Sequence, residues 1–214
     1  MQNKFFLYGI LLCHYINSRC NFKFFFDHDS AIDIHLFCAY RRSLELYNKI
    51  DIIYFSTTDL LAFRSAIAIL DEELTEFKYY MTNEDTVNVV YYDYLINIRY
   101  LPENNSVIDS VFYNNINFRL VDINTLLSIK LSEYENLNNQ DFLKILSLMY
   151  LLRKEIQYNN ILIYFLQIGL DIKKMCKYLN RLLKSTDTHG KGLCNVSLEK
   201  QIKQSQLFID YFNV

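Results

Sequence analysis

Asp51 stands near the start of an almost wholly apolar segment, 49–56, whose composition predicts a buried strand. A carboxylate in such a strand is costly unless it is paired, protonated or bound to a metal ion. Asp51 is therefore a candidate metal-binding or catalytic carboxylate. The alternative is that it lies at the first exposed position of the strand, where a charged side chain is common.

Two charged residues in the second half of the chain are further candidates. Lys130 could contact a phosphate group with its ammonium, or it could be a solvated lysine on an amphipathic helix. Asp141 could help to form a site, or it could cap the apolar helix that follows it. The residue types alone leave both pairs of alternatives open.

A cysteine and a histidine could form a nucleophilic pair. His35 and Cys38 are three residues apart on a predicted helix, so they would share a face. No third group is in place to orient the base, and a core cysteine beside a partly exposed histidine is the more common arrangement. His28, Asp29 and Ser30 are adjacent in sequence, which is not the geometry of a catalytic triad.

The composition is that of a globular protein. Of the 214 residues, 51% are hydrophobic and 21% are charged, which excludes a wholly disordered chain. Four glycines and one proline exclude collagen-like and proline-rich proteins. The formal net charge of −2 gives no overall attraction to nucleic acids. The five cysteines and four histidines show no metal-ligand spacing, so no zinc site is expected.

The cysteines and the first residues bear on the cellular compartment. An odd set of five cysteines without a CxxC pair is typical of a reducing cytosol, so we expect a cytoplasmic protein. The apolar run 5–13 has the length of a signal peptide, but it is too short to span a membrane and no clear cleavage site follows it. We expect residues 1–20 to form a helix. A secreted protein from which these residues are removed is the alternative.

Hydrophobic periodicity predicts the elements that must position the candidate residues. Helix-like and strand-like segments alternate up to residue 75, hairpin-like strands occupy 76–121, and a helical period persists from residue 122. The sequence therefore predicts an α+β fold, a mixed sheet flanked by helices and followed by a C-terminal helical region, with domains at 1–121 and 122–214. The expected helices are 1–20, 31–46, 57–75, 124–135, 141–155, 159–169, 171–185 and 197–212.

The segment around Asp51 resembles the first motif of the AbiEii-type nucleotidyltransferase toxins. That motif reads Arg-x-Ser-x-Asp-hydrophobic-Asp and continues with aromatic residues. When the two are aligned through residues 54–56, Asp51 falls on the first carboxylate and Ile53 replaces the second. The third carboxylate of the family lies on a later strand, which corresponds to 95–101 and has Asn97 in the acidic place.

The first helices of the C-terminal region resemble the same family. A family helix of the form Ile-x-x-hydrophobic-Lys-Leu is similar to 126–131, which places Lys130 on the lysine. A later Lys-Asp-hydrophobic-hydrophobic segment is similar to 140–143, which places Asp141 on the aspartate, while Lys144 replaces a second aspartate.

This resemblance implies a nucleotidyltransferase-like fold and transfer of a nucleotidyl group from a nucleoside triphosphate to a hydroxyl of an RNA, such as a tRNA, or of a protein. It implies that Asp51 binds Mg²⁺, that Lys130 contacts phosphate and that Asp141 positions the substrate or a base. It also implies an antitoxin protein as a partner. Because two of three expected carboxylates are missing and one cannot hold two ions, it implies a degenerate member with little or no turnover.

Basic residues are concentrated in the C-terminal region. Between residues 171 and 203 there are eight basic side chains and three acidic ones. Lys173, Lys177, Arg181 and Lys184 recur at helical spacing and would form one stripe. Such a stripe could bind an RNA backbone, or it could be a solvated helix face.

A non-catalytic module is the alternative to an enzyme. In that case the α/β part would be a scaffold, and the C-terminal helices would bind a partner protein. An exposed apolar stripe on 141–169 would favour this alternative, because exposed apolar surface marks sites of protein association.

Overall fold

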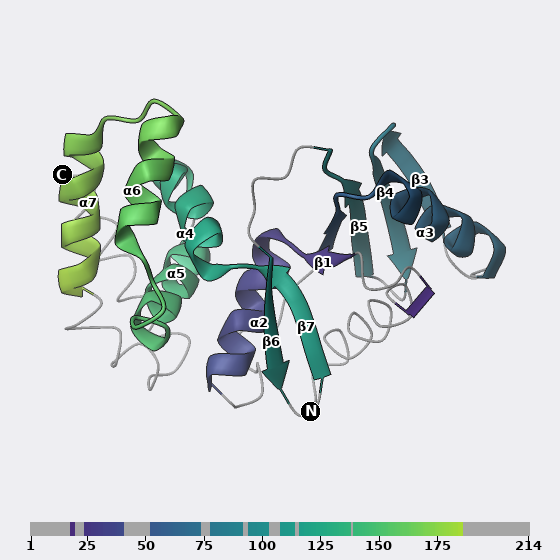
Figure 1. The fold of residues 1–214 in the computed structure, drawn as a ribbon, viewed down its shortest axis with the longest axis horizontal. Helices are drawn as coiled ribbons and strands as arrows, with labels where there is room; N and C mark the ends of the chain where they lie inside the picture. Colours follow the sequence, from purple (N-terminus) through teal and green to yellow (C-terminus); the bar gives the residue numbers. More distant parts are fainter. Residues whose placement is uncertain are drawn as a thin grey trace. The chain divides into compact units, whose positions relative to one another are not determined.

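A computed structural model describes residues 18–19, 24–40, 52–73, 78–91, 94–102, 108–113, 116–137 and 139–185. The predicted helix 197–212, Asp51 and most of the predicted helix 1–20 lie outside these residues. The chain divides into two compact units, Met1–Asp122 and Ile123–Val214, and each is described by itself (Figure 1).

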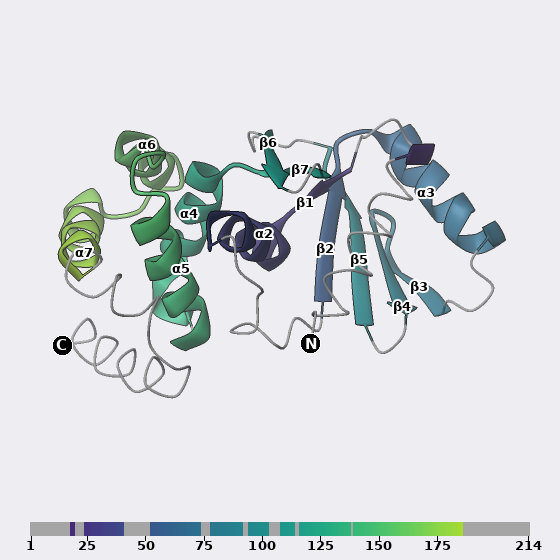
Figure 2. The same ribbon diagram turned by 90° about the horizontal axis from the view of Figure 1, so that it is seen from below.

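The first unit is built on a seven-stranded mixed sheet of order β3-β4-β5-β2-β1-β7-β6. The β1–β7 and β2–β5 pairs are parallel and the other neighbouring pairs are antiparallel. Figure 2 shows β2, β5, β4 and β3 side by side. The strands are β1 (Phe25–Phe26), β2 (Ile52–Thr57), β3 (Lys78–Asn83), β4 (Thr86–Tyr91), β5 (Tyr94–Tyr100), β6 (Ile108–Tyr113) and β7 (Ile116–Val121).

The two faces of the sheet differ in polarity because side chains alternate along each strand. One face carries buried apolar residues, namely Ile53, Phe55, Val87, Val89, Ile96 and Ile98. Helix α3 (Leu60–Glu73) covers this face, and the ring of its Phe63 lies 6.1 Å from that of Tyr100. The opposite face of β2 and β5 carries mostly polar side chains, among them Tyr54, Ser56, Asn97 and Arg99.

Helix α2 (His28–Tyr40) packs on the other part of the sheet, against β2, β6 and β7. It begins three residues before the predicted start at residue 31. Asp27 explains the difference, because its main-chain oxygen accepts the N–H of Ala31 and its carboxylate accepts the N–H of His28. A side-chain oxygen that satisfies a first-turn N–H stabilises a helix start.

The second unit is helical. Its elements are α4 (Ile123–Ser132), a 3₁₀ turn (Tyr134–Asn136), α5 (Asn139–Leu151), α6 (Tyr158–Gln167) and α7 (Ile172–Ser185). The structure thus confirms the predicted α+β class, a mixed sheet with flanking helices followed by C-terminal helices. Among the residues described, no helix combines the length and the apolar character needed to cross a membrane.

Gly169 ends α6 with a positive φ of 76°. The N–H of Gly169 donates to Leu166 O, and the N–H of Leu170 donates to Phe165 O. These two bonds form a Schellman motif, which satisfies carbonyl groups of the last turn and requires a left-handed residue after the helix. Glycine adopts that conformation without a steric penalty, so the predicted helix boundary at this residue has a direct physical cause.

Candidate functional site

The second and third carboxylate positions of the resemblance lie on opposite faces of the sheet. Strand β2 pairs with β5 so that Ile53 is opposite Ile96 and Tyr54 is opposite Asn97. Register partners in a parallel pair share a face, and neighbours along a strand do not. On the face of Asn97, β2 presents Ile52, Tyr54 and Ser56, none of which is acidic. Because of this register, side chains at positions 53 and 97 cannot both contribute to one metal cluster.

Of the three site residues predicted from sequence, the structure describes two, Lys130 and Asp141. Asp51 lies outside the described residues. Lys130 is half-buried in the last turn of α4, and Asp141 is half-buried in the first turn of α5, both in the second unit. A carboxylate in the first turn and a lysine in the last turn both interact favourably with the helix dipole. That interaction gives each of them a structural role.

The polar face of the sheet gathers a different set of side chains. Tyr54 and Ser56 on β2 stand beside Asn97 and Arg99 on β5, their register partners. Asn97 Nδ2 donates to Asn88 Oδ1 at 2.7 Å, so the polar side chains of this face extend from β5 to β4. Arg99 is half-buried, and its guanidinium has no hydrogen bond or ion pair with any residue that the structure describes.

Asp27 and His28 complete this set at the end of β1. Asp27 Oδ2 lies 3.1 Å from His28 Nδ1 and accepts a hydrogen bond from Ser56 Oγ at 3.2 Å. The imidazole ring is stacked on the ring of Tyr54, with centroids 5.1 Å apart. Ser30 Oγ accepts the N–H of Tyr54 at 2.9 Å and so ties the start of α2 to β2.

Burial and hydrogen bonding act in opposite directions on Asp27. Its burial raises the pKa of the carboxyl, while the adjacent His28 side chain and its charge, the main-chain N–H of His28 and the Ser56 hydroxyl lower it. The net pKa is below the ordinary value. The carboxylate is thus ionised at neutral pH although Asp27 is only 6% exposed. An ionised, buried acceptor holds the imidazole that it contacts in a fixed tautomer.

His28 has an unusual backbone conformation. Its φ is 49°, the only positive value found at a non-glycine residue among those described. A bulky residue in the left-handed region costs free energy and persists only where its surroundings impose it. Here the contacts to Asp27 and Tyr54 impose it, and they leave the His28 side chain 42% exposed.

His35 and Cys38 are not a nucleophilic pair. His35 Nε2 lies 3.0 Å from the main-chain oxygen of Val121 and is buried there. Burial lowers the pKa of His35 and raises that of the half-buried Cys38 thiol to about 11. A thiol with that pKa is protonated at neutral pH and is a poor nucleophile.

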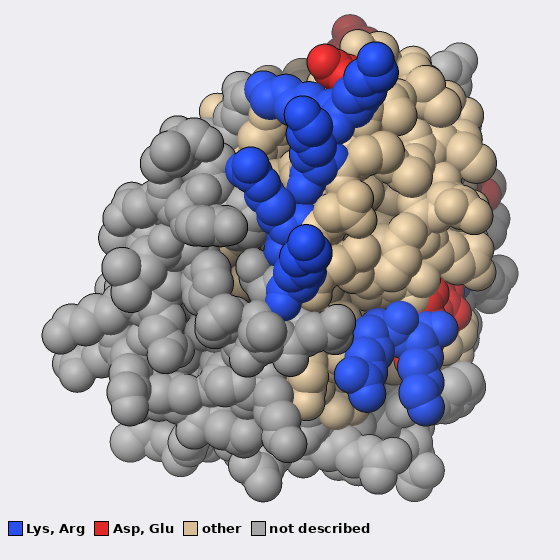
Figure 3. All heavy atoms as spheres, turned by 90° about the vertical axis from the view of Figure 1, so that its left-hand side faces the viewer, with Lys and Arg blue, Asp and Glu red and all other residues tan. Residues whose placement is uncertain are grey.

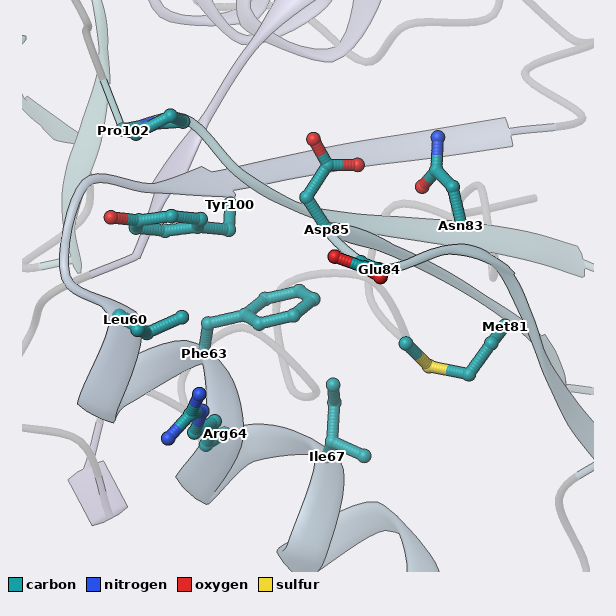
Figure 4. A pocket seen from close by; sticks show the side chains of 10 residues that line it. All are labelled: Leu60, Phe63, Arg64, Ile67, Met81, Asn83, Glu84, Asp85, Tyr100 and Pro102. Atoms are coloured by element: carbon teal, nitrogen blue, oxygen red, sulfur yellow. The ribbon is translucent and has the colours of Figure 1, made fainter.

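A cavity of about 810 Å³ opens on the apolar side of the sheet, between α3 and the β3–β4 hairpin (Figure 4). It lies at the carboxyl ends of the parallel strands β2 and β5, where α/β sheets commonly bind ligands. Its walls are mainly apolar, and both signs of charge are present. The lining residues are Leu60, Phe63, Arg64, Ile67, Met81, Asn83, Glu84, Asp85, Tyr100 and Pro102.

Helix α7 presents a cationic face. Its buried side consists of Met175, Tyr178, Leu179 and Leu182. Its exposed side carries five basic residues, Lys173, Lys174, Lys177, Arg181 and Lys184, and the helix contains no acidic residue. Basic side chains form a continuous column on this side of the molecule (Figure 3). The predicted stripe is therefore exposed as a whole.

Helix α6 exposes an apolar stripe. Ile163 and Leu166 are 51% and 61% exposed, and Ile168 at the end of the helix is 47% exposed. Ile161 and Phe165, on the opposite side of the helix, are buried. This is the exposed apolar surface within 141–169 that the protein-binding alternative anticipated.

No family model, no curated protein and no solved structure matches the chain. Within the described residues, no group of three or more histidine, cysteine or acidic side chains is placed to hold a metal ion.

Proposed function

We propose that this protein binds RNA through the cationic face of α7. The observation that carries the proposal is the exposed row of Lys173, Lys177 and Arg181, four residues apart and without an acidic residue on the helix. Successive members of such a row rise by about 6 Å along the helix. Lysine and arginine rows of this kind neutralise consecutive phosphates of a nucleic acid and release its counterions.

The cationic row lowers the stability of its own helix. Like charges four residues apart are unfavourable by roughly 0.2–0.5 kcal/mol for each pair. Lys173 and Lys174 also lie in the first turn, where the helix dipole disfavours cations. Asp171 offsets part of this cost, because its Oδ1 accepts the N–H groups of both residues. The cationic row lowers the stability of α7, and binding of an anionic ligand such as RNA accounts for its presence.

For the α/β unit we propose a degenerate nucleotidyltransferase-like role. The support is the sequence resemblance, and the absence of acidic residues at Ile53 and Asn97 argues for weak or no turnover. Any residual activity would use a nucleoside triphosphate with Mg²⁺ at Asp51, with Lys130 at phosphate, Asp141 positioning the substrate and an RNA as acceptor. A cytoplasmic location and an antitoxin partner belong to the same proposal.

Fluorescence anisotropy with a labelled single-stranded RNA tests RNA binding. The variant K173Q/K177Q/R181Q should raise the Kd about tenfold or more, because three phosphate contacts are removed. The variant R64Q/K78Q/K154Q removes the same charge from exposed positions outside α7 and should bind like the wild type. Equal weakening in both variants would mean that only net charge matters, and the proposal would fail.

A second candidate function is binding of a partner protein through α6. The observation that favours it is the exposed apolar row of Ile163 and Leu166, three residues apart on one face of α6. If a partner covers this row, I163S/L166S should abolish co-purification of that partner from the native host while leaving RNA binding unchanged. A partner that is retained by this variant and lost with the α7 variant would assign the interface to α7 instead.

A further inference from the structure

We propose that His28 is a general base for cleavage of a phosphodiester that has a neighbouring hydroxyl, and that Arg99 binds the phosphate. The choice of RNA as the natural substrate rests on the proposed function, but the chemistry does not. The site is the polar set after β1 and on β2 and β5, namely Asp27, His28, Tyr54, Ser56, Asn97 and Arg99.

The contacts of His28 determine which of its ring nitrogens can accept a proton. Nδ1 is buried and lies 3.1 Å from the Asp27 carboxylate, at an angle that makes no hydrogen bond. The negative charge at this distance favours the neutral ring that carries its proton on Nδ1. Nε2 then has the lone pair. Nε2 makes no hydrogen bond with any described residue and is not among the buried unsatisfied atoms, so it is open to a ligand.

The neighbours of Asp27 keep this arrangement rigid. Ser56 Oγ donates to the carboxylate oxygen that lies near His28 Nδ1, and the main-chain N–H of His28 donates to the other oxygen. The Tyr54 ring supports the imidazole from one side. Asp27 acts on the reaction only through His28, so it is a positioning residue.

Arg99 supplies the charge that such a reaction needs. It is the register partner of Ser56, which itself contacts Asp27. Arg99 on β5 and Asp27 after β1 therefore flank β2, which lies between these two strands. The Arg99 side chain is half-buried and its guanidinium has no partner among the described residues. A guanidinium binds a phosphate through two parallel hydrogen bonds and stabilises the additional negative charge of the transition state.

The reaction is a transesterification. His28 Nε2 accepts the proton of the substrate hydroxyl, and the oxygen forms a bond to the adjacent phosphorus. The bond from phosphorus to the leaving oxygen breaks, and that oxygen takes a proton from water. The products are a cyclic phosphate and a free alcohol, and His28 returns its proton to solvent, so no further reactant is consumed.

The test uses 2-hydroxypropyl 4-nitrophenyl phosphate with the full chain in EDTA. This small diester does not need α7, so failure of the RNA proposal would leave the result unaffected. The wild type should release 4-nitrophenolate above the buffer rate. The rate of release should be about 100-fold lower in H28Q. Free imidazole should restore part of the rate of this variant. R99Q should raise KM, whereas D27N should lower kcat with little change in KM.

K78Q is the matched control, since Lys78 is an exposed residue of β3 outside the site. Its rate should equal that of the wild type, and circular dichroism should show each variant folded. A wild-type rate equal to buffer would overturn the inference, as would a folded H28Q with the wild-type rate. RNA binding at α7 without diester cleavage would retain the proposed function and reject only this site.

Discussion

Tyr54 on β2 and Asn97 on β5 are register partners, and their side chains leave the same face of the sheet. This relationship separates Asn97 from Ile53, which leaves the opposite face and is buried among apolar residues. A two-ion cluster needs carboxylates that converge on one point. The sheet instead presents amide, hydroxyl, imidazole and guanidinium groups on its polar face.

Nucleotide binding at Asp51 is the first prediction. Because a single carboxylate cannot supply a two-ion clamp, nucleoside triphosphate with Mg²⁺ should raise the unfolding midpoint of the wild type no more than that of Asp51→Ala. A thermal-shift titration measures this, since a ligand of the folded state raises the midpoint with its concentration. Metal-dependent label transfer from a nucleotide that is lost in Asp51→Ala would contradict the prediction.

Replacement of Asp27 should change the acid stability of the protein. The pKa of Asp27 is lowered in the folded state. The ionised carboxylate therefore stabilises the fold fully above pH 3.8, the ordinary pKa, and this stabilisation is lost as the pH falls through the folded pKa. Asp27→Asn should lower the free energy of unfolding by about 1–3 kcal/mol at pH 7. The difference should shrink below pH 4 or so. Urea titrations against Glu72→Gln, an exposed control, measure it.

His35 should make the protein less stable in mild acid. Its pKa is below the ordinary 6.5 because it is buried, so the unfolded chain takes up a proton first as the pH falls below 6.5. The free energy of unfolding should therefore decrease as the pH is lowered below 6.5. The decrease should be smaller in His35→Gln. If the free energy of unfolding decreases equally with pH in both proteins, His35 is not the cause of the acid sensitivity.

Cys38 should resist alkylation. With a pKa of about 11 its thiol is almost wholly protonated at neutral pH, and the thiolate is the reactive form. Iodoacetamide labelling followed by peptide mass spectrometry should show slow modification that accelerates as the pH rises. Rapid labelling at pH 7 that depends on His35 would restore the nucleophilic pair.

Gly169 offers a test of the end of α6. A Cβ there would meet no atom within 4 Å, so Gly169→Ala has only the conformational cost of a positive φ, about 1–2 kcal/mol. Gly169→Asn should cost less, because asparagine adopts this conformation more readily. Denaturant unfolding of the three proteins should give this order. An alanine variant as stable as the wild type would mean that the Schellman motif does not form.

The sequence predicted features that depend on neighbours along the chain. The helical period gave α6 and α7 and the cationic row of Lys173, Lys177 and Arg181, because exposure follows from spacing on a helix. It did not give the site at His28. Asp27 and Ser56 are 29 residues apart and meet only because β1 lies next to β2, and no local pattern encodes which strands pair. The local sequence of residues 27–30 therefore predicts only a polar turn.

The salt dependence of RNA binding is the most direct test of the central claim. For single-stranded RNA, a plot of the logarithm of the binding constant against the logarithm of the salt concentration has a negative slope. Each phosphate contact contributes about 0.7 to the size of that slope. Loss of Lys173, Lys177 and Arg181 should therefore reduce the slope by about 2, while R64Q/K78Q/K154Q should keep the wild-type slope. An unchanged slope in the α7 variant, or no RNA binding by the wild type, would contradict the account.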